Sequence, residues 1–442
     1  MSRSLIFAHI NTFREILPGE EWVSVLDTGV PVLLVRIGNY PLHHGSLGVV
    51  RTVGRLGVPV HAVVEDRFTP VALSRHLTSS IVWPTTGREE PERLADGLLS
   101  LGRTIGARCV AVPTDDEAAI LLAEYAHRLK ECFLIPAVPA HLPRLLACKA
   151  SLHRICGEAG VPSPRSRAPE SRDELVEAGR ELGYPLALKN LAAFSRLRTP
   201  AVSGTTIVVP DERALLDRFP QAAPPPVLVQ EYIPRQQAED WITHLYCGTG
   251  GVPRVLFTGL KLRSWPPYAG MTARAVALRN PELARLAERL CRLIGYSGLA
   301  DLDWRYDRRD GQYKLVDFNP RAGAQFRLFE DVHGVDVVRA MHLDLTGRPV
   351  PDGAQAEGRV FVAGQLDFAS AVAWLHQERR LPPDLLSEPP TERAWLCRDD
   401  PLPAAAEAVR FAALVTWRLL RPALRPGRVP LTEGSTGTPP TS

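Results

Sequence analysis

The sequence predicts an α/β protein that combines a parallel-sheet domain with a longer α+β region. Apolar strands alternate with helix-forming segments over the first third of the chain, beginning with PVLLVRI at 31–37. Strands and helices that alternate in this way form a parallel sheet with right-handed crossovers. After about residue 141 the order becomes less regular and includes an acidic β-hairpin at 298–320. These two observations set the fold class.

The composition is that of an ordinary globular protein and excludes several functional classes. The 442 residues are 45% hydrophobic and 23% charged, and the net charge of +3 gives no field that favours nucleic acid. No apolar stretch is long enough for a spanning helix, and the N-terminus lacks a signal-peptide cleavage site. The seven cysteines are scattered without a CxxC pair. We therefore expect a cytoplasmic protein with reduced thiols and no zinc site.

Changes in pattern and composition divide the chain into six segments. The last one is rich in Pro, Gly, Ser and Thr, and we expect it to be disordered. The segments are an N-terminal extension (1–30), a doubly wound parallel-sheet domain (31–140), an α+β unit (141–232), a strand-rich unit with the hairpin (233–348), a C-terminal extension (349–425) and the tail (426–442).

Two acidic residues, Asp115 and Asp116, follow the strand CVAVP at 109–113. The carboxyl ends of parallel strands are where open α/β sheets bind ligands, so a substrate contact is one interpretation. A helix N-cap explains one of the two without a ligand. The first strand of the domain ends in GNYPLHHGSLG rather than GxGxxG, which argues against a dinucleotide-binding oxidoreductase. The two histidines in that turn have no third ligand at metal spacing.

The hairpin at 298–320 concentrates acidic side chains on one face. Residues i and i+2 of a strand share a face, and the DRRDG turn predicts a register with Asp303 opposite Asp317. This register brings Asp303, Asp317 and Asn319 together, with Arg321 aimed at the same place. Clustered carboxylates repel unless a cation lies between them, and oxygen ligands select Mg²⁺ or Mn²⁺. A solvated polar surface is the alternative interpretation.

Only five of the 52 basic residues are lysines. Lys149 falls in a predicted helix and Lys189 ends the strand YPLALK; either one alone could extend into solvent. Lys130 and Lys314 suggest no role, and we expect Lys314 to be solvated on its hairpin strand. The strand VLVQEYIP at 227–234 indicates by itself only an edge strand or a hinge.

Taken together, the order of these motifs resembles the ATP-grasp superfamily over about residues 31–345. The ordered features are Lys149, Lys189, QEYI at 230–233, Asp303 and the sequence DFNPR at 317–321. The narrower motifs VPTDDEA, KLRSWPPYAG and DDPLP resemble the bacterial carboxylate–amine ligases grouped with D-aspartate ligase. The resemblance implies a Rossmann-like domain at 31–140, a lid subdomain at 141–232 and an antiparallel catalytic subdomain at 233–348.

The resemblance also implies roles for residues around ATP. Lys149 and Lys189 would bind the phosphates, and Glu231, Tyr232 and Ile233 would line the adenine pocket. Glu239 would bind the ribose hydroxyls, with Asp240 as the alternative. Asp303, Asp317 and Asn319 would hold two Mg²⁺ (or Mn²⁺) ions, Arg321 would stabilise the transferring phosphoryl group, and Lys261 and Arg263 would clamp the γ-phosphate or a substrate carboxylate.

The function implied is that of an ADP-forming ligase that joins a carboxylate to an amine through an acyl phosphate. The expected partners are small-molecule carboxylates and amines, with amino acids among the candidates. No nucleic-acid partner is expected. An ATP-grasp carboxylase and an ATP-binding module without turnover are the alternatives. The segment at 190–205, longer than the compact Gly-rich loop of many relatives, would carry Ser195, Arg196 and Arg198 over the triphosphate or form a less ordered lid.

The C-terminal extension ends in an amphipathic helix with a basic end, within residues 404–428. Such a helix either docks on the protein core or lies on a membrane surface, where the arginines of 418–428 would face lipid headgroups.

Overall fold

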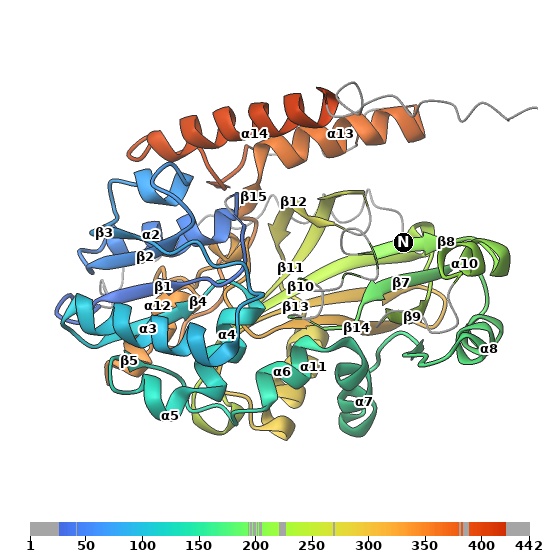
Figure 1. Cartoon of the computed structure of the whole chain (residues 1–442), viewed down its shortest axis with the longest axis horizontal. Coiled ribbons are helices and arrows are strands. Elements are labelled where there is room, and N and C mark those ends of the chain that lie inside the picture. Colours follow the sequence, from blue (N-terminus) through green and yellow to red (C-terminus); the bar gives the residue numbers. More distant parts are fainter. Residues whose placement is uncertain are drawn as a thin grey trace, which may run out of the picture.

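The computed structural model contains three β-sheets with helices packed around them (Figure 1). It describes residues 26–40, 42–192, 194, 197, 200, 202, 206–220, 227–267, 270–379, 382 and 389–420. Three of the predicted features therefore lie outside the described residues. They are residues 1–25 of the expected N-terminal extension, the tail 426–442, and the lid residues Ser195, Arg196 and Arg198.

The N-terminal sheet is parallel, as the alternation of strands and helices predicts, with the order β3-β2-β1-β4-β5. Helices cover both faces, so every residue of the central strand β1 is buried. Its elements are β1 (Val32–Val35), α2 (His44–Gly54), β2 (Val60–Val64), β3 (Ser79–Val82), α3 (Pro91–Ile105), β4 (Cys109–Pro113), α4 (Asp116–Glu124), α5 (Ala126–Leu129) and β5 (Phe133–Leu134).

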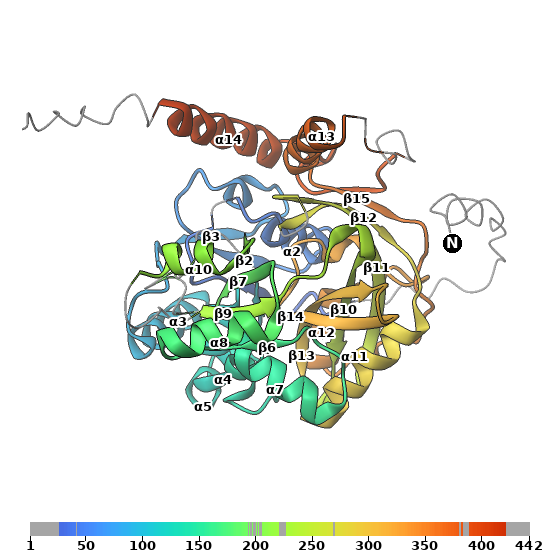
Figure 2. The ribbon, with the colours of Figure 1, turned by 90° about the vertical axis from the view of Figure 1, so that its right-hand side faces the viewer.

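A four-stranded antiparallel sheet follows, in the order β6-β9-β7-β8. It has its own small apolar core, formed where α8 and α10 pack on the strands. Figure 2 shows this sheet beside the large sheet. Its elements and the helices around it are α6 (Leu142–Ala147), α7 (Lys149–Ala159), β6 (Ser166–Arg167), α8 (Arg172–Leu182), β7 (Leu186–Asn190), β8 (Thr206–Val209), α10 (Glu212–Arg218) and β9 (Val227–Glu231).

The largest sheet has seven strands in the order β14-β13-β10-β11-β12-β15-β16. The predicted hairpin forms its edge. Asp303 lies opposite Asp317 as expected, because a register shift between Asp303 and Trp304 moves the pairing by one residue from the register that the turn sets. The elements are β10 (Ala238–Cys247), β11 (Pro253–Trp265), β12 (Met271–Ala277), α11 (Pro281–Ile294), β13 (Gly298–Asp307), β14 (Gln312–Asn319) and α12 (Val337–Leu345).

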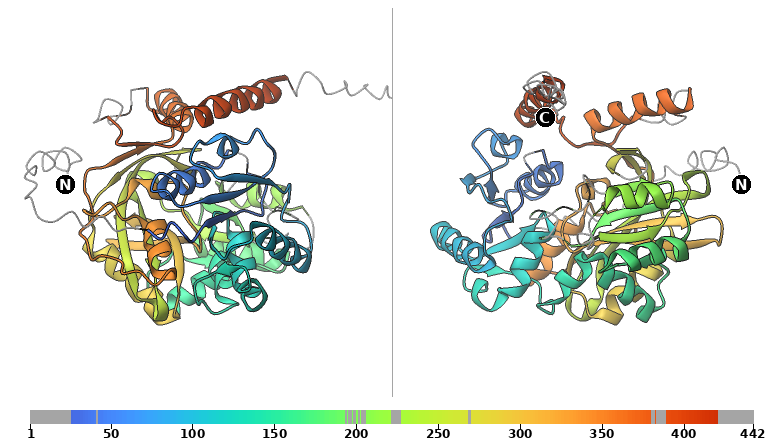
Figure 3. Two further views of the ribbon diagram at one scale, coloured as in Figure 1. Left: turned by 90° about the vertical axis from the view of Figure 1, so that its left-hand side faces the viewer. Right: turned by 45° about the vertical axis from the view of Figure 1, so that its right-hand side comes forward.

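The C-terminal extension adds two short strands to the large sheet and two helices to the outside of the molecule. Figures 1 and 3 show these helices as a separate outer layer. Within the described residues, no helix has the length and apolar character needed to cross a membrane. The elements are β15 (Val360–Val362), α13 (Gly364–Glu378), β16 (Glu392–Arg393) and α14 (Leu402–Leu420).

Candidate active site

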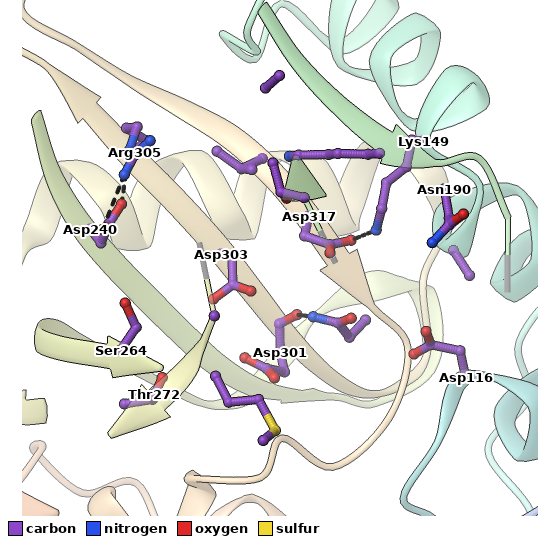
Figure 4. Close-up of a pocket in the computed structure, with 18 of the residues that line it drawn as sticks. Asp116, Lys149, Asn190, Asp240, Ser264, Thr272, Asp301, Asp303, Arg305 and Asp317 are labelled. Carbon is purple, nitrogen blue, oxygen red and sulfur yellow. Dashed lines mark hydrogen bonds and ion pairs between the residues drawn. The ribbon is translucent and has the colours of Figure 1, made fainter. Parts of the chain in front are cut away.

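A cavity of about 750 Å³ opens where the three sheets meet (Figure 4). The four-stranded sheet lines one side through Lys189 and Gln230, and the large sheet lines the other through Asp303 and Asp317. The N-terminal domain closes one end with Asp116, from the start of α4. Residues from three segments that are far apart in sequence therefore share one cavity.

Two lysines line the cavity, one from helix α7 and one from strand β7. Lys149 is the first residue of α7, and its backbone amide donates to the carbonyl of Leu191, while its ammonium pairs with Asp317. Lys189 lies buried in β7. Burial, together with the nearby charge of Lys149, lowers the pKa of Lys189 to about 8. Two ammonium groups this close are stabilised by an anion of several charges, such as a polyphosphate.

The hairpin supplies the acidic wall of the cavity. Asp301 lies opposite Asn319, and Asp303 lies opposite Asp317. Burial raises the pKa of Asp303, and the neighbouring carboxylates add to this effect, although the ammonium of Lys261 pairs with it. Burial alone would also raise the pKa of Asp317, but Lys149 holds it below its usual value. The lysines thus neutralise the acidic side chains that the sequence predicted to gather here.

The donor atoms of this wall fit Mg²⁺. Asp303, Asp317 and Asn319 present only carboxylate and amide groups, and the amide nitrogen of Asn319 is bonded to the carbonyl of Asp301, so the amide oxygen remains to act as a ligand. No three His, Cys, Asp or Glu side chains among the described residues are grouped to hold a metal by themselves. Mg²⁺ characteristically takes one or two carboxylates and completes its shell with water and substrate phosphates.

Arg321, just after β14, joins the large sheet to the N-terminal domain. Its Nη1 donates to Asp301 Oδ2 at 3.0 Å, and its Nε lies 3.4 Å from Asp116 Oδ1. On the far side, His244 Nε2 lies 3.2 Å from the other oxygen of Asp301. Burial opposes the charge on Asp301, yet His244 and Arg321 hold the pKa of that carboxyl well below its usual range. The guanidinium is therefore fixed between two carboxylates at the edge of the cavity.

Of the two acidic residues Asp115 and Asp116, Asp115 is the N-cap of helix α4. Its Oδ1 accepts from the amide of Ala118, and its Oδ2 accepts from the amides of Ile37 and Gly38. These bonds commit both of its oxygens to the backbone. Asp116 is left as the residue of the pair that meets Arg321.

The strand and turn at 231–233 line the opposite end of the cavity. Glu231 Oε1 accepts from the amide of Arg165 at 3.0 Å and lies 3.4 Å from Lys314 Nζ. Lys314 is buried and also pairs with Asp307 at 2.8 Å, so the expectation that it is solvated is wrong. The Glu231 carboxylate is thus held by protein groups.

Comparisons with known proteins agree with this architecture. No family model matches the chain. D-aspartate ligase of Enterococcus faecium is 25% identical over 294 residues, which is 63% of this chain and 68% of that protein. Biotin carboxylase of Allochromatium vinosum is 24% identical over 242 residues, or 52% of each chain.

Solved structures show the same fold. N5-carboxyaminoimidazole synthetase of Staphylococcus aureus, complexed with ADP, matches with a TM-score of 0.55 at 12% identity and covers 76% of this chain and 82% of that one. The biotin carboxylase domain of the Hydrogenobacter thermophilus 2-oxoglutarate carboxylase, complexed with MgADP and bicarbonate, matches with a TM-score of 0.52 at 18% identity and covers 73% and 71%. The chain therefore shares the fold of these solved structures, and its sequence is similar to that of D-aspartate ligase.

Two of the predicted site residues lie away from the cavity. Asp240 lines it and pairs with Arg305 at 2.9 Å, whereas Glu239 projects from the other face of β10 and bonds to Trp241 and Arg308. Asp240, the alternative to Glu239, is thus the residue of the two that lines the cavity. Successive residues of a strand point to opposite faces of the sheet, so neighbouring residues such as Glu239 and Asp240 cannot both face the cavity.

Arg263 is the second predicted site residue that lies away from the cavity. It is buried against Asp367 of α13, while Lys261 and Ser264 line the cavity. The pairing of β11 with β12 is irregular on both sides of Arg263, which turns its side chain away from the face of Lys261. Sequence spacing alone could not reveal this irregularity.

Asp301 and His244 are the residues that the sequence-based site omitted. The alternation LADLD puts Asp301 on the same face as Asp303, which was a usable signal. His244 lies directly opposite Asp301 in β10 and carries no motif of its own.

Proposed function

We propose that this protein is an ATP- and Mg²⁺-dependent carboxylate–amine ligase that forms an amide bond through an acyl phosphate. The observation that carries the proposal is the set of charges around one cavity: Lys149 and Lys189 on one side, and Asp303, Asp317 and Asn319 on the other. Arg321 lies at the end nearest the N-terminal domain. This arrangement suits a polyphosphate held next to a second substrate.

In the first step, a carboxylate oxygen of the substrate attacks the γ-phosphorus of ATP. The bond between that phosphorus and the β,γ-bridging oxygen breaks, and ADP leaves. In the second step, an amine nitrogen attacks the acyl carbon, loses a proton, and expels inorganic phosphate. Lys149 and Lys189 hold the phosphate chain, and Arg321 stabilises charge on the transferred group.

Asp303, Asp317 and Asn319 would hold Mg²⁺, which supplies charge neutralisation for the phosphate oxygens. The ammonium groups of Lys261 and Lys149 now pair with two of these acids and would turn to the phosphates when the nucleotide is present. The walls of the cavity would shield the acyl phosphate from water. The substrates are small carboxylates and amines, amino acids among the candidates, and the reduced cysteines fit a cytoplasmic reaction.

The test is to incubate the protein with ATP, Mg²⁺ and pools of carboxylates and amines, to measure ADP release, and to search by mass spectrometry for condensation products. The Asp317→Asn variant should lose ADP release, while Asp217→Asn, on the exposed surface of α10, should retain it. Equal rates for the two variants would contradict the proposed site.

An ATP-grasp carboxylase is the second candidate, because biotin carboxylases are among the proteins that this chain resembles. Bicarbonate separates the two functions. A carboxylase releases ADP only when bicarbonate is added, whereas a carboxylate–amine ligase releases ADP without it and requires an organic carboxylate.

A further inference from the structure

Helix α13 carries apolar side chains on two opposite faces. Leu366, Ser370 and Trp374 are buried toward β11 and β12, where the helix packs on the large sheet. Phe368 and Val372 lie on the other side of the helix and are exposed, Phe368 by 73%. A helix that is apolar on both faces is normally covered on both. In this chain only the inner face is covered by described residues.

Helix α14 shows the same arrangement. It packs against the short turn at Pro70–Leu73, and Arg410 pairs with Asp66 at 2.5 Å, which ties the helix to the N-terminal domain. Val409 is 70% exposed, and Leu402 is also exposed. The helix is therefore anchored along one side and presents apolar side chains on the other.

The two helices form one outer layer of the molecule. Figure 1 and both views of Figure 3 show α13 and α14 on the same side, outside the three sheets and away from α11. We call their outward faces the outer helix layer, defined by Phe368, Val372 and Leu375 of α13 and by Leu402 and Val409 of α14.

The charge of this region selects the kind of partner. Between Glu407 and Glu433 the sequence contains five arginines, at 410, 418, 421, 425 and 428, and no acidic residue. Glu407 is the single acidic residue of α14 and is buried. Pairing with a second copy of the chain would add a second set of arginines with no exposed carboxylate among the described residues of α14 to meet them. An apolar surface that carries negative charge is the complementary partner.

We propose that the outer helix layer docks on an anionic phospholipid bilayer, with α13 and α14 lying in the plane of the interface. Apolar side chains enter the boundary between headgroups and acyl chains, and the positive charge of the sequence between Glu407 and Glu433 favours anionic headgroups. This proposal is independent of the catalytic function, because its surface lies outside the cavity.

The experiment is sedimentation of the full-length protein with vesicles of phosphatidylglycerol and phosphatidylcholine in equal parts, compared with phosphatidylcholine alone. We expect the protein to pellet with the anionic vesicles and to be released by salt. The double variant Phe368→Ser/Val409→Ser should bind about tenfold more weakly. Replacing the arginines at 418, 421, 425 and 428 by glutamine should abolish the preference for phosphatidylglycerol.

The matched control is Leu293→Ser, which removes an apolar side chain of similar exposure (62%) from α11, on the other side of the molecule. It should leave vesicle binding unchanged. Absence of binding to anionic vesicles, or equal binding of the double variant and the control, would overturn the proposal. So would light scattering that shows a dimer which the double variant dissociates, because the layer would then pair with a second copy. The melting temperature of each variant establishes that it is folded.

Discussion

Lys189 is the side chain in which size and charge can be separated. It is buried in β7, and its ammonium shares the cavity with that of Lys149. The planar guanidinium of arginine needs more room than a compact ammonium. We expect Lys189→Arg to lower kcat/KM for ATP about 100-fold although the charge is kept. Steady-state ADP release measures this effect, with the exposed Lys130→Arg as the control. Near-normal turnover would mean that charge alone suffices.

We expect Asp301 to act by positioning Arg321, because its carboxylate lies between that guanidinium and His244. Removing its charge should lower kcat and leave the affinity for ATP nearly unchanged. In a double-mutant cycle, Asp301→Asn should have little further effect once Arg321→Lys is present. Additive losses in kcat would show instead that Asp301 supports the sheet and does not position Arg321.

Helix α2 contains a buried histidine whose titration bears on stability. His44 packs against Phe361 and Trp395, and burial lowers its pKa to about 4. The unfolded chain, with a histidine pKa near 6.5, binds the proton first, so stability falls as the pH drops from about 6.5 to 4. His44→Phe keeps the ring contacts and should remove up to about 3 kcal/mol of that loss.

Urea unfolding at several pH values measures this effect. His141→Gln is the control, because His141 is exposed. An unchanged pH dependence of the unfolding free energy in His44→Phe would contradict the assignment.

At the level of elements, local patterns were enough where local chemistry decides the structure. The hairpin could be predicted, because two alternating runs flank a turn that contains glycine. The pairing of Asp303 with Asp317 also depends on a register shift between Asp303 and Trp304, which the turn does not set. Arg263 could not be placed, because the irregular pairing of β11 with β12 leaves no mark in the sequence. Lys314 could not either, because one of its partners, Glu231, comes from a strand 83 residues away.

At the scale of the whole molecule, a buried contact joins the C-terminal extension to the N-terminal domain. Asp400, which is 1% exposed, accepts from Arg51 Nε at 2.9 Å and from Ser74 Oγ at 2.8 Å, so the C-terminal extension is fixed to the N-terminal domain. Its neighbour Asp399 pairs with Arg55 and is 46% exposed.

These neighbouring acids make a matched pair for a stability measurement. Asp400→Ala leaves the Arg51 charge buried and should cost about 3–5 kcal/mol of unfolding free energy. Asp399→Ala breaks a half-exposed pair and should cost about 1 kcal/mol or less. Urea denaturation measures both values. Equal costs would mean that the buried pair does not fix the extension to the domain.

The central claim is that the carboxylate substrate is activated as an acyl phosphate, and the fate of its oxygen tests this most directly. The carboxylate identified in the condensation screen is labelled with ¹⁸O and incubated with the enzyme, ATP, Mg²⁺ and the amine, and the released phosphate is analysed by mass spectrometry. The account predicts one ¹⁸O atom in each inorganic phosphate, released together with ADP. Unlabelled phosphate, or ¹⁸O appearing in AMP with release of pyrophosphate, would contradict it.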